Sequence, residues 1–463
     1  MTNKPETNQT PRRRETDKDL VRVRLAEPTT ALSERLVTGD IIGQGGTGKI
    51  EKAFDANLLR YVAKKKLLEN DGDSGYQRGR LIEEAQITSQ LGHPNIVPVH
   101  ELGIDADNNL FFTMKLVQGR TFGSILDEKD CARRTKKDLY FYLQILTKVC
   151  DALAFAHSRG VVHRDLKPDN IMVGEFGEVY LMDWGLAKLQ KGWRPSKRDT
   201  VMPVSLMPQL GDRELYEAMD EDGLLRGTIY YMSPEQARGD FNAIDERTDI
   251  FLLGGILYKI LTRRAPYHGD NVYQLIYQAQ QAEIQPPEVV SERDTPTKLS
   301  DIAMKALEKD PGDRYQSVID LKNDIEEFLQ SGWQFDRRVF NAGTVIVKEG
   351  DIGDTAYVIT KGRCEVYRTI DGVKHPIAEI KKGDVFGEVA VFTQEPRSAT
   401  VAAVDYVTAL EIKRDYFEDD LGMSFWLGLF TKALAERFLE KNEQVIALQQ
   451  QIGLLRGEND SRK

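Results

Sequence analysis

The sequence predicts an α+β protein in which a strand-rich lobe, a helix-rich lobe, a small β barrel and a terminal helix follow one another. Three changes of pattern predict this order. Residues 36–118 alternate short apolar runs with turns, residues 122–330 show helical periodicity, and residues 335–415 return to short runs separated by glycines. Residues 424–456 are again helical in pattern. A cleft between two such lobes is a natural ligand site.

These changes divide the 463 residues into four predicted segments. Residues 1–33 are rich in polar and charged side chains, which predicts a disordered tail. Residues 34–330 form the two lobes, residues 335–424 form the barrel, and residues 425–463 form the C-terminal helix.

The composition, with 41% hydrophobic and 29% charged residues, is that of a globular chain. The net charge of −10 argues against nucleic acid as a partner, because phosphate repels a net anion. The cysteines at 131, 150 and 364 have no metal-binding spacing and form no even disulfide set, which favours a reducing, cytoplasmic compartment. We expect no membrane segment, since the N-terminus lacks an apolar core and the best candidate, Ile250 to Leu261, is short and contains Lys259.

Apolar runs and turns locate the elements of the two lobes. The first lobe has predicted strands at 35–46, 61–68, 96–103 and 110–117 and a helix over Arg80–Leu91. The second lobe is predicted from helical patterns such as 139–160, and its last helix covers 320–330.

The barrel is predicted from alternating runs such as 344–350 and 364–370 with tight turns between them. Glycines punctuate these runs at 343, 350, 353, 362, 372, 383 and 387, a pattern typical of a small barrel or jelly roll. The first barrel strand is expected near residue 343, about a dozen residues after the last helix of the lobes. A flexible tether would be longer and richer in Gly or Ser. The short connection therefore predicts that movement of the barrel is transmitted to the second lobe.

Gly43, Gly45 and Gly48 form a G-x-G-x-x-G arrangement, with Ile50 in the strand that follows. Glycines let a hairpin close on a polyphosphate, because no Cβ blocks the approach of the backbone. The pattern is not a dinucleotide-binding fingerprint, since a strand rather than a helix follows. Taken alone, it fits an ordinary glycine-rich hairpin.

An Ala-Lys-Lys-Lys run follows on the next predicted strand, at 63–66. Side chains alternate along a strand, so Ala63 and Lys65 share one face and the other two lysines share the opposite face. A small and a long side chain suit the face towards a nucleotide, and Glu84 on the following helix is the candidate counter-ion of Lys65. The alternative is a run of solvated lysines.

The most specific text is HRDLKPDN at 163–170, followed by LMDWG at 181–185. The set continues with SPE at 233–235, Asp249 and Arg314. Together with the glycine hairpin, the Ala-x-Lys pair and the helix glutamate, it resembles the eukaryotic-like (Hanks-type) serine/threonine protein kinases over residues 36–330. The resemblance implies the bilobal protein-kinase fold, ATP and Mg²⁺ as cofactors, and phosphate transfer to protein hydroxyl groups.

The resemblance also implies a role for each residue of the second lobe. Asp165 accepts or orients the proton of the substrate hydroxyl, and Lys167 neutralises charge on the transferred phosphate. Asn170 and Asp183 supply oxygen ligands to Mg²⁺, a hard ion that bridges phosphates. Arg164 would bind a negative charge on the activation segment.

In the first lobe, the resemblance implies that Lys65, held by Glu84, pairs with the α and β phosphates. Met114 stands at the gatekeeper position, and Lys115 to Val117 form the hinge whose backbone binds adenine. The other nucleotide-binding residues expected here are Gly43, Gly45, Gly48, Ile50 and Ala63. Two structural roles are also implied: a buried ion pair between Glu235 and Arg314, and a brace for the catalytic loop from Asp249.

Two further features bear on activity. Lys167 and Thr228 favour Ser or Thr over Tyr as the acceptor residue. Trp184 stands where most of the family has Phe, and its indole N–H needs a partner. No catalytic group is missing, so we predict an active enzyme, with a catalytically inactive pseudokinase scaffold as the alternative.

An insertion at roughly 190–225 lengthens the activation segment beyond the family's usual length. It is basic in its first half and acidic in its second. One interpretation is a disordered insertion with solvated charges. The other is that the acidic patch, or a phosphate on Ser196, Thr200 or Ser205, engages Arg164 and orders the segment.

In the barrel, FGEVAVFTQEPRSATV at 386–401 resembles the phosphate-binding cassette of cyclic-nucleotide-binding domains. The planar guanidinium of Arg397 can bind both outer oxygens of a cyclic phosphate. A short helix starting near Gly387 would direct N–H groups at the same phosphate, and Glu388 would accept from the ribose 2′-hydroxyl. The hydroxyl of Ser398 can contact guanine, which weakly favours cyclic GMP over cyclic AMP.

Two alternatives stay open for the C-terminal part of the chain. The barrel is either the nucleotide-binding regulator of the kinase or a sensor that has lost its ligand, with Arg397 in a surface ion pair. The terminal helix either packs on its own barrel or forms a short coiled-coil seam in a homodimer. Its apolar 3-4-3 pattern comprises Val445, Leu448, Ile452 and Leu455.

Overall fold

The computed structural model describes residues 35–44, 48–67, 74–128, 135–189, 229–269, 271–291 and 295–414. The chain divides into two compact units. The first, called the strand-rich unit, holds the chain up to Ser89 together with Pro98–Leu116, and the second holds Gln90–Val97 and the chain from Val117 onwards. The predicted tail at 1–33, the insertion at 190–225 and the helix at 425–463 lie outside the described residues.

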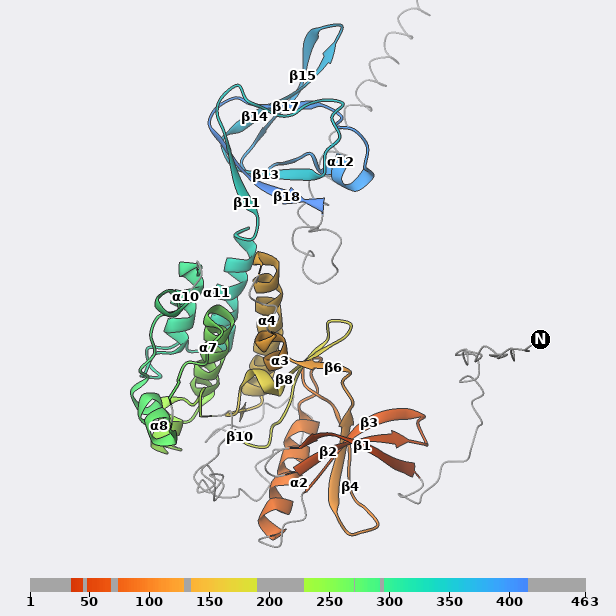
Figure 1. Cartoon of the computed structure of the whole chain (residues 1–463), viewed down its shortest axis with the longest axis vertical. Coiled ribbons are helices and arrows are strands. Elements are labelled where there is room, and N and C mark those ends of the chain that lie inside the picture. Colours follow the sequence, from red (N-terminus) through yellow and green to blue (C-terminus); the bar gives the residue numbers. More distant parts are fainter. Residues whose placement is uncertain are drawn as a thin grey trace, which may run out of the picture. The chain divides into compact units, whose positions relative to one another are not determined.

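The strand-rich unit is an antiparallel sheet of five strands with one helix (Figure 1). Its elements are β1 (Leu36–Gln44), β2 (Gly48–Asp55), β3 (Arg60–Leu67), α2 (Ser74–Gln90), β4 (Val99–Ile104) and β5 (Leu110–Lys115). The strand order is β1-β2-β3-β5-β4. All four predicted runs contribute strands, and the predicted helix begins six residues earlier than its apolar pattern suggested, at Ser74.

The second unit begins with a lobe of helices, here called the helical lobe (residues 119–330). Its helices are α3 (Phe122–Asp127), α4 (Lys136–Ser158), η3 (Pro168–Asn170), α6 (Pro234–Arg238), α7 (Glu246–Thr262), α8 (Val272–Gln281), α9 (Pro287–Val290), α10 (Thr297–Ala306) and α11 (Val318–Gln330). Its short strands are β6 (Gly119–Thr121), β7 (Val161–Val162), β8 (Ile171–Gly174), β9 (Val179–Leu181) and β10 (Lys188–Leu189).

Local sequence accounts for where the main helices begin. Thr135 and Asp138 form a reciprocal capping box at the start of α4. Asp245 caps α7 and Ser317 caps α11 through side-chain oxygens that accept from backbone N–H groups. These acceptors satisfy N–H groups that have no partner within the first turn of a helix.

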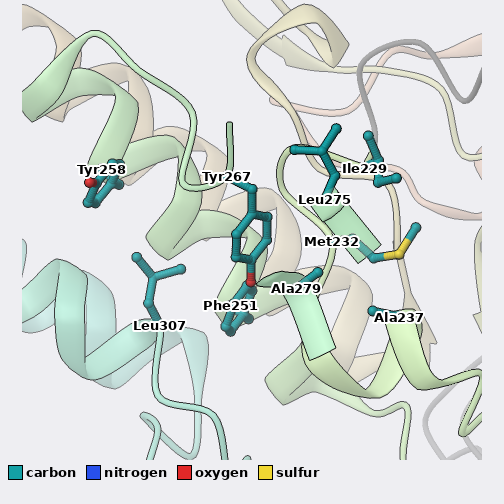
Figure 2. Close-up of a cluster of buried hydrophobic side chains, with 9 residues drawn as sticks. All are labelled: Ile229, Met232, Ala237, Phe251, Tyr258, Tyr267, Leu275, Ala279 and Leu307. Carbon is teal, nitrogen blue, oxygen red and sulfur yellow. The ribbon is translucent and has the colours of Figure 1, made fainter. Parts of the chain in front are cut away.

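A buried apolar cluster links the segments around α6, α7, α8 and the end of α10 (Figure 2). Its members are Ile229, Met232, Ala237, Phe251, Tyr258, Tyr267, Leu275, Ala279 and Leu307. Burial of the Tyr267 ring raises the pKa of its hydroxyl far above the ordinary value, so the group stays neutral. The cluster therefore holds the helical lobe together without a buried charge.

Helix α4 is the described helix that is long and apolar enough to cross a membrane by length and composition. The sequence had pointed to 250–261 instead, which lies within α7. Half of the apolar stretch in α4 is buried inside the protein. A core helix passes the same test, so this feature is weak support for a membrane span.

The barrel (residues 336–414) consists of two four-stranded antiparallel sheets, with orders β11-β18-β13-β16 and β12-β17-β14-β15. Its elements are β11 (Asp336–Phe340), β12 (Val345–Val347), β13 (Thr355–Lys361), β14 (Arg363–Ile370), β15 (Val373–Lys381), β16 (Val385–Phe386), α12 (Glu388–Thr393), β17 (Thr400–Ala403) and β18 (Val407–Lys413). The predicted glycines, except Gly353, have positive φ, which explains why these turns use glycine.

The expected first barrel strand near 343 is wrong. Strand β11 begins at Asp336 and pairs with β18, so only Ser331 to Phe335 connect α11 to the barrel. The segment Asp336–Phe340 is mostly exposed and charged, and it lacks the apolar alternation by which strands are recognised. Pairing with a distant strand, rather than local pattern, makes it a strand.

Candidate active site and ligand site

In the strand-rich unit, the predicted pair of Lys65 and Glu84 is present. Lys65 Nζ on β3 lies 2.6 Å and 2.8 Å from the two carboxylate oxygens of Glu84 on α2. Glu84 is buried, and a buried carboxylate without a cationic partner is destabilising, so its ion pair with Lys65 is favoured. The long side chain of Lys65 is thereby fixed on the face of the sheet that the alternation predicted.

The neighbouring lysines are not a solvated run. Lys64 is only 5% exposed and pairs with Asp105 at 3.6 Å, while Lys66 pairs with Glu51 at 3.1 Å. The alternative interpretation of this segment is therefore wrong. The two faces of β3 carry two separate sets of ion pairs.

The other nucleotide-binding residues predicted in this unit lie on adjacent strands. Ala63 and Met114 are buried register partners on β3 and β5. Gly43 and Ile50 are register partners in the hairpin of β1 and β2, whereas Gly45 lies outside the described residues. Lys115 and Val117 are half-buried at and after the end of β5.

Gly48 has a structural reason to be glycine in addition to the predicted one. A Cβ at this position would lie 2.8 Å from the backbone oxygen of Lys66 on β3. Real Cβ atoms essentially never approach that closely, so the strand pairing itself requires a glycine here. Packing alone therefore accounts for the last glycine of the G-x-G-x-x-G pattern.

In the helical lobe, residues 163–170 form a loop, here called the catalytic loop, between β7 and β8. Lys167 Nζ lies 3.0 Å from Oδ2 of Asp165. Asn170 Nδ2 donates to the backbone oxygen of Asp165 at 2.7 Å and to its Oδ2 at 3.0 Å. The carboxylate of Asp165 is thus oriented by one cationic and one neutral donor within five residues of sequence.

Asp249 on α7 braces the backbone of this loop, as predicted. Its two carboxylate oxygens accept from the backbone N–H groups of His163 and Arg164, both at 2.8 Å. His157 Nε2, at the end of α4, lies 2.7 Å from Oδ2 of Asp249. Complete burial acts to raise the pKa of Asp249, but these hydrogen bonds and charges hold it below the ordinary value.

Arg164 is held within the same loop. It adopts a left-handed backbone conformation, with φ of 69°, and its Nε donates to the backbone oxygen of Leu186 at 2.5 Å. The predicted phosphate acceptors Ser196, Thr200 and Ser205 lie outside the described residues, as does Thr228. The binding of Arg164 to a negative charge on the activation segment stays a prediction.

Asp183 also has a positive φ, of 59°, and its side chain is exposed. Asn170 donates through Nδ2 to Asp165, which leaves its Oδ1 as an acceptor atom. An amide oxygen and a carboxylate are ligands that Mg²⁺ prefers. The part of the chain that the structure describes contains no cluster of three His, Cys, Asp or Glu residues suited to a metal. The residues therefore fit an ion that is bound by two side chains and by phosphates.

Trp184 departs from expectation. Its ring is 1% exposed and lies 4.5 Å from the ring of His163, centroid to centroid. Among the described residues, its indole N–H has no hydrogen-bond partner. The aromatic slot is filled, but the predicted partner for the N–H is not there.

The predicted structural ion pair is present and buried. Arg314 donates from Nη1 and Nη2 to the two carboxylate oxygens of Glu235, at 2.8 Å and 2.9 Å. Thr248 donates a further hydrogen bond to Glu235. Burial acts to raise the pKa of Glu235, but Arg314 and Thr248 hold it below the ordinary value.

In the barrel, Arg397 is buried rather than part of the surface ion pair that one alternative supposed. Its Nη1 donates to the backbone oxygen of Gly387 at 2.6 Å, and its Nη2 donates to the backbone oxygen of Thr355 at 2.6 Å. Burial lowers the pKa of Arg397, although the charges of Asp354 and Glu388 act to raise it. No carboxylate within residues 295–414 forms an ion pair with it.

The other predicted nucleotide-binding residues surround Arg397. Gly387 precedes α12 with φ of 79° and without a side-chain cap, and Glu388 is the first residue of that helix and is buried. Ser398 is exposed, and its backbone oxygen accepts from Nε of Arg368 at 2.7 Å. A Cβ on Gly353 or Gly387 would overlap the guanidinium, so both glycines make room for it. The residues fit an anionic ligand.

Three contributors were missed at the level of sequence. His157 could have been found, because it lies in the last turn of a predicted helix just before the catalytic loop. Thr355 and Gly353 could not, since their contacts with Arg397 join residues more than 40 positions apart.

The strand-rich unit thus carries a Lys–Glu pair, the helical lobe a braced aspartate loop, and the barrel a buried arginine. Residues 36–333 match the family model described as "Protein kinase domain", and residues 337–421 match "Cyclic nucleotide-binding domain". The first match covers well over half of the chain. The chain therefore belongs to the protein kinase family and carries a cyclic nucleotide-binding domain after its kinase domain.

Relatives with similar sequences are each named serine/threonine-protein kinase PknD. The protein of Chlamydia felis is 37% identical over 298 residues, which cover 63% of this chain and 30% of the relative. That of Protochlamydia amoebophila is 34% identical over 297 residues, covering 62% and 29%. That of Chlamydia muridarum is 35% identical over 297 residues, covering 63% and 31%. The chain thus spans less than a third of the length of these relatives.

Proposed function

We propose that this chain is a serine/threonine protein kinase that transfers the γ-phosphate of ATP to protein hydroxyl groups, and that a cyclic nucleotide bound to the barrel regulates it. The catalytic loop carries the first part of this proposal. Both Lys167 and Asn170 donate to the carboxylate of Asp165, and Asp249 fixes the backbone on which that carboxylate stands. The names of the relatives support the same activity.

In this proposal the residues of the loop divide the work of phosphate transfer. Asp165 orients the incoming hydroxyl and takes up its proton, and Lys167 offsets the charge on the transferred phosphate. Asn170 and Asp183 hold Mg²⁺, which when bound neutralises charge between the phosphates. The exposed position of Asp183 suits a ligand to an ion that arrives with the nucleotide.

The residues of the strand-rich unit are proposed to hold the nucleotide. Lys65, kept in place by Glu84, binds the α and β phosphates. The other proposed nucleotide-binding residues are Gly43, Gly45, Gly48, Ile50, Ala63, Met114, Lys115 and Val117. The glycines are included because they allow the backbone to approach the phosphates closely, and the apolar residues because they would form an apolar pocket for adenine.

The barrel is proposed to bind cyclic AMP or cyclic GMP as an effector. Arg397 would exchange two neutral carbonyl acceptors for the charged cyclic phosphate, which is the stronger acceptor. Glu388 would accept from the ribose hydroxyl, and Ser398 is the position at which the two bases are distinguished. Activation and inhibition of the kinase are both outcomes that the assay below separates.

The proposal places the protein in the cytoplasm, with protein substrates as partners and without nucleic acid or a membrane. The net charge of −10 supports the absence of nucleic acid, and the described cysteines, Cys150 and Cys364, are buried and free rather than paired. A homodimer through the terminal helix is part of the proposal, supported by the apolar spacing at 445–455.

A phosphorylation assay with Mg-ATP and a Ser/Thr-rich protein tests the activity. We expect Asp165→Asn to lower the rate by roughly 10²- to 10⁴-fold, the usual contribution of general base catalysis. The matched control is Asp107→Asn, the same change on an exposed turn, which should leave the rate unchanged. Each protein is assayed with and without cyclic AMP and cyclic GMP.

Equal rates for wild type and Asp165→Asn would overturn the proposed catalytic role. If wild type labels no serine or threonine, its own included, the chain is an inactive scaffold instead. Rates that do not change with either nucleotide, despite measured binding, would remove only the regulatory half of the proposal.

A further inference from the structure

The connection between the helical lobe and the barrel, Ser331 to Phe335, is here called the join. Ser331 is the C-cap of α11, and Gly332 follows in the left-handed region with φ of 71°. This is the usual way for a glycine to stop a helix and turn the chain back. The join therefore has a defined backbone path on the side of the helical lobe.

Trp333 then packs back onto the helix it has just left. Its ring stacks on that of Phe328, with centroids 4.9 Å apart and planes inclined by 27°. The backbone oxygen of Phe328 accepts from both N and Oγ of Ser331, at 3.1 Å and 2.7 Å. A contact between these two positions commonly accompanies a left-handed helix stop, so its origin is local.

Two residues later the chain is already inside the barrel. Phe335 is 2% exposed and belongs to the core cluster that also contains Val391 of α12 and Ile412 of β18. Its backbone N–H donates to the oxygen of Gly332 at 3.1 Å. One short turn thus carries an aromatic ring in contact with α11 and another in the barrel core.

The barrel cluster reaches the proposed ligand site. Val391 lies on α12, the helix that begins with Glu388. The residue before this helix, Gly387, accepts the hydrogen bond from Arg397. A ligand that draws Arg397 away from Gly387 removes a hydrogen bond at the start of α12, and Phe335 shares a core cluster with Val391 further along the same helix.

On the other side, α11 reaches the catalytic loop. Lys322 on α11 lies 2.7 Å from Asp151 on α4. His157 in the last turn of α4 lies 2.7 Å from Asp249, and Asp249 accepts a hydrogen bond from the backbone N–H of His163. Each step joins groups packed or hydrogen-bonded within the second unit.

We propose that the join couples the barrel to the catalytic loop, with Trp333 and Phe335 as the positioning residues that transmit a change at α12 to α11. This inference rests on the proposed function, in which the barrel is the regulator of the kinase. A flexible connection would not transmit such a change, because a flexible tether does not fix the orientation of the two domains that it joins. The coupling is assigned to these five residues of chain, beside which Lys136 on α4 also pairs with Asp336 on β11 at 3.1 Å.

A test that needs no nucleotide uses hydrogen exchange in α11. Ile412→Val removes one buried methyl group from the barrel core and is expected to speed backbone exchange in residues 318–330. The same substitution is then made in a protein with Gly-Ser-Gly-Ser inserted between Gly332 and Trp333. There we expect no change in α11. Equal acceleration with and without the insertion, or none in either, would overturn the inference.

Two single substitutions provide matched variants of the contact itself. Trp333→Ala removes the stack on Phe328 and should weaken the effect of Ile412→Val on α11. Trp333→Phe keeps an aromatic ring there and removes the indole N–H, which has no hydrogen-bond partner among the described residues. It should preserve the effect. If Trp333→Ala behaves like wild type, Trp333 has no positioning role.

The kinase assay with nucleotide separates this inference from the proposed function. We expect the insertion to abolish the change in rate on nucleotide addition, with unchanged affinity for nucleotide and unchanged rate in its absence. A wild type that shows no rate change, but does show coupled exchange in α11, would contradict the regulation and keep the coupling. An insertion variant that responds like wild type would contradict the coupling and keep the regulation.

Discussion

The helical lobe and the barrel each bury an arginine, and the two are satisfied in different ways. Arg314 is 2% exposed and forms a bidentate ion pair with Glu235. Arg397 is 6% exposed and donates to the backbone oxygens of Gly387 and Thr355, which are neutral. The two arginines are therefore similarly buried, but the charge of Arg314 is neutralised by a carboxylate and that of Arg397 is not.

The difference distinguishes a charge that is already neutralised by a carboxylate from one that is available to the proposed anionic ligand. A buried cation that is paired with a carboxylate has no charge left for a ligand, whereas one that is bound by carbonyls keeps its attraction for an anion. Hydrogen bonds to charged acceptors are stronger than those to neutral ones. The comparison predicts that loss of Arg314 damages the fold and that loss of Arg397 damages binding.

Arg314→Met is expected to have the largest effect. The change leaves Glu235 buried without its cation, which costs about 3–5 kcal/mol of unfolding free energy. Urea unfolding followed by hydrogen exchange in α7 measures this loss within the helical lobe. Arg397→Met is the matched substitution in the barrel. If Arg314→Met and Arg397→Met destabilise their domains equally, the comparison fails.

Acid should weaken the same pair to a smaller extent, because a protonated glutamate still accepts hydrogen bonds. The pKa of Glu235 is lowered in the folded protein from its ordinary value of 4.5. Its stabilising contribution is therefore complete above that value and is lost as the pH falls through the folded pKa. The stability of Glu235→Gln should fall less than that of wild type between roughly pH 5 and pH 3. Identical slopes for the two proteins would contradict this.

Arg397→Met should weaken cyclic nucleotide binding without loss of barrel stability. Removal of a charge-assisted hydrogen bond worth about 1.5–3 kcal/mol corresponds to a roughly 10- to 150-fold rise in Kd. Calorimetric titration with cyclic AMP and cyclic GMP measures it, and thermal unfolding provides the control. The kinase rate without nucleotide should stay the same. Unchanged affinity for both nucleotides would show that Arg397 is not the anchor.

Gly353→Ala should sharpen the comparison with a smaller effect. The position has no positive φ, so alanine is tolerated by the backbone, but its Cβ would overlap the guanidinium of Arg397. We expect a displaced arginine and a Kd raised by less than in Arg397→Met. Gly92→Ala, at a site with nothing within 4 Å of the added atom, is the control. A Kd equal to that of wild type would show that the guanidinium position does not limit binding.

Much of the candidate active site could be predicted because its contacts are short-range or motif-defined. Asp165, Lys167 and Asn170 lie within one turn of chain, so their mutual hydrogen bonds follow from the loop that the motif forms. The pair of Lys65 and Glu84 followed from strand alternation and one helix face. The positive-φ glycines of the barrel turns could likewise be predicted, because they separate the alternating runs of the sequence.

Other features depend on distant partners and could not be predicted. The indole N–H of Trp184 was expected to find an acceptor, yet packing against His163 leaves it without one among the described residues. Strand β11 has no apolar alternation and exists because β18 pairs with it. The join became shorter than expected for the same reason.

By itself, the amino-acid sequence determined which residues form the proposed phosphate-handling set and where the main helices and turns lie, because those properties depend on neighbours along the chain. Only the tertiary structure decided that Arg397 donates to the oxygens of Gly387 and Thr355 and that Phe335 enters the core with Val391. These partners come from separate strands and helices. Whether a buried group meets a charge, a carbonyl or nothing is set by long-range packing, which local pattern does not encode.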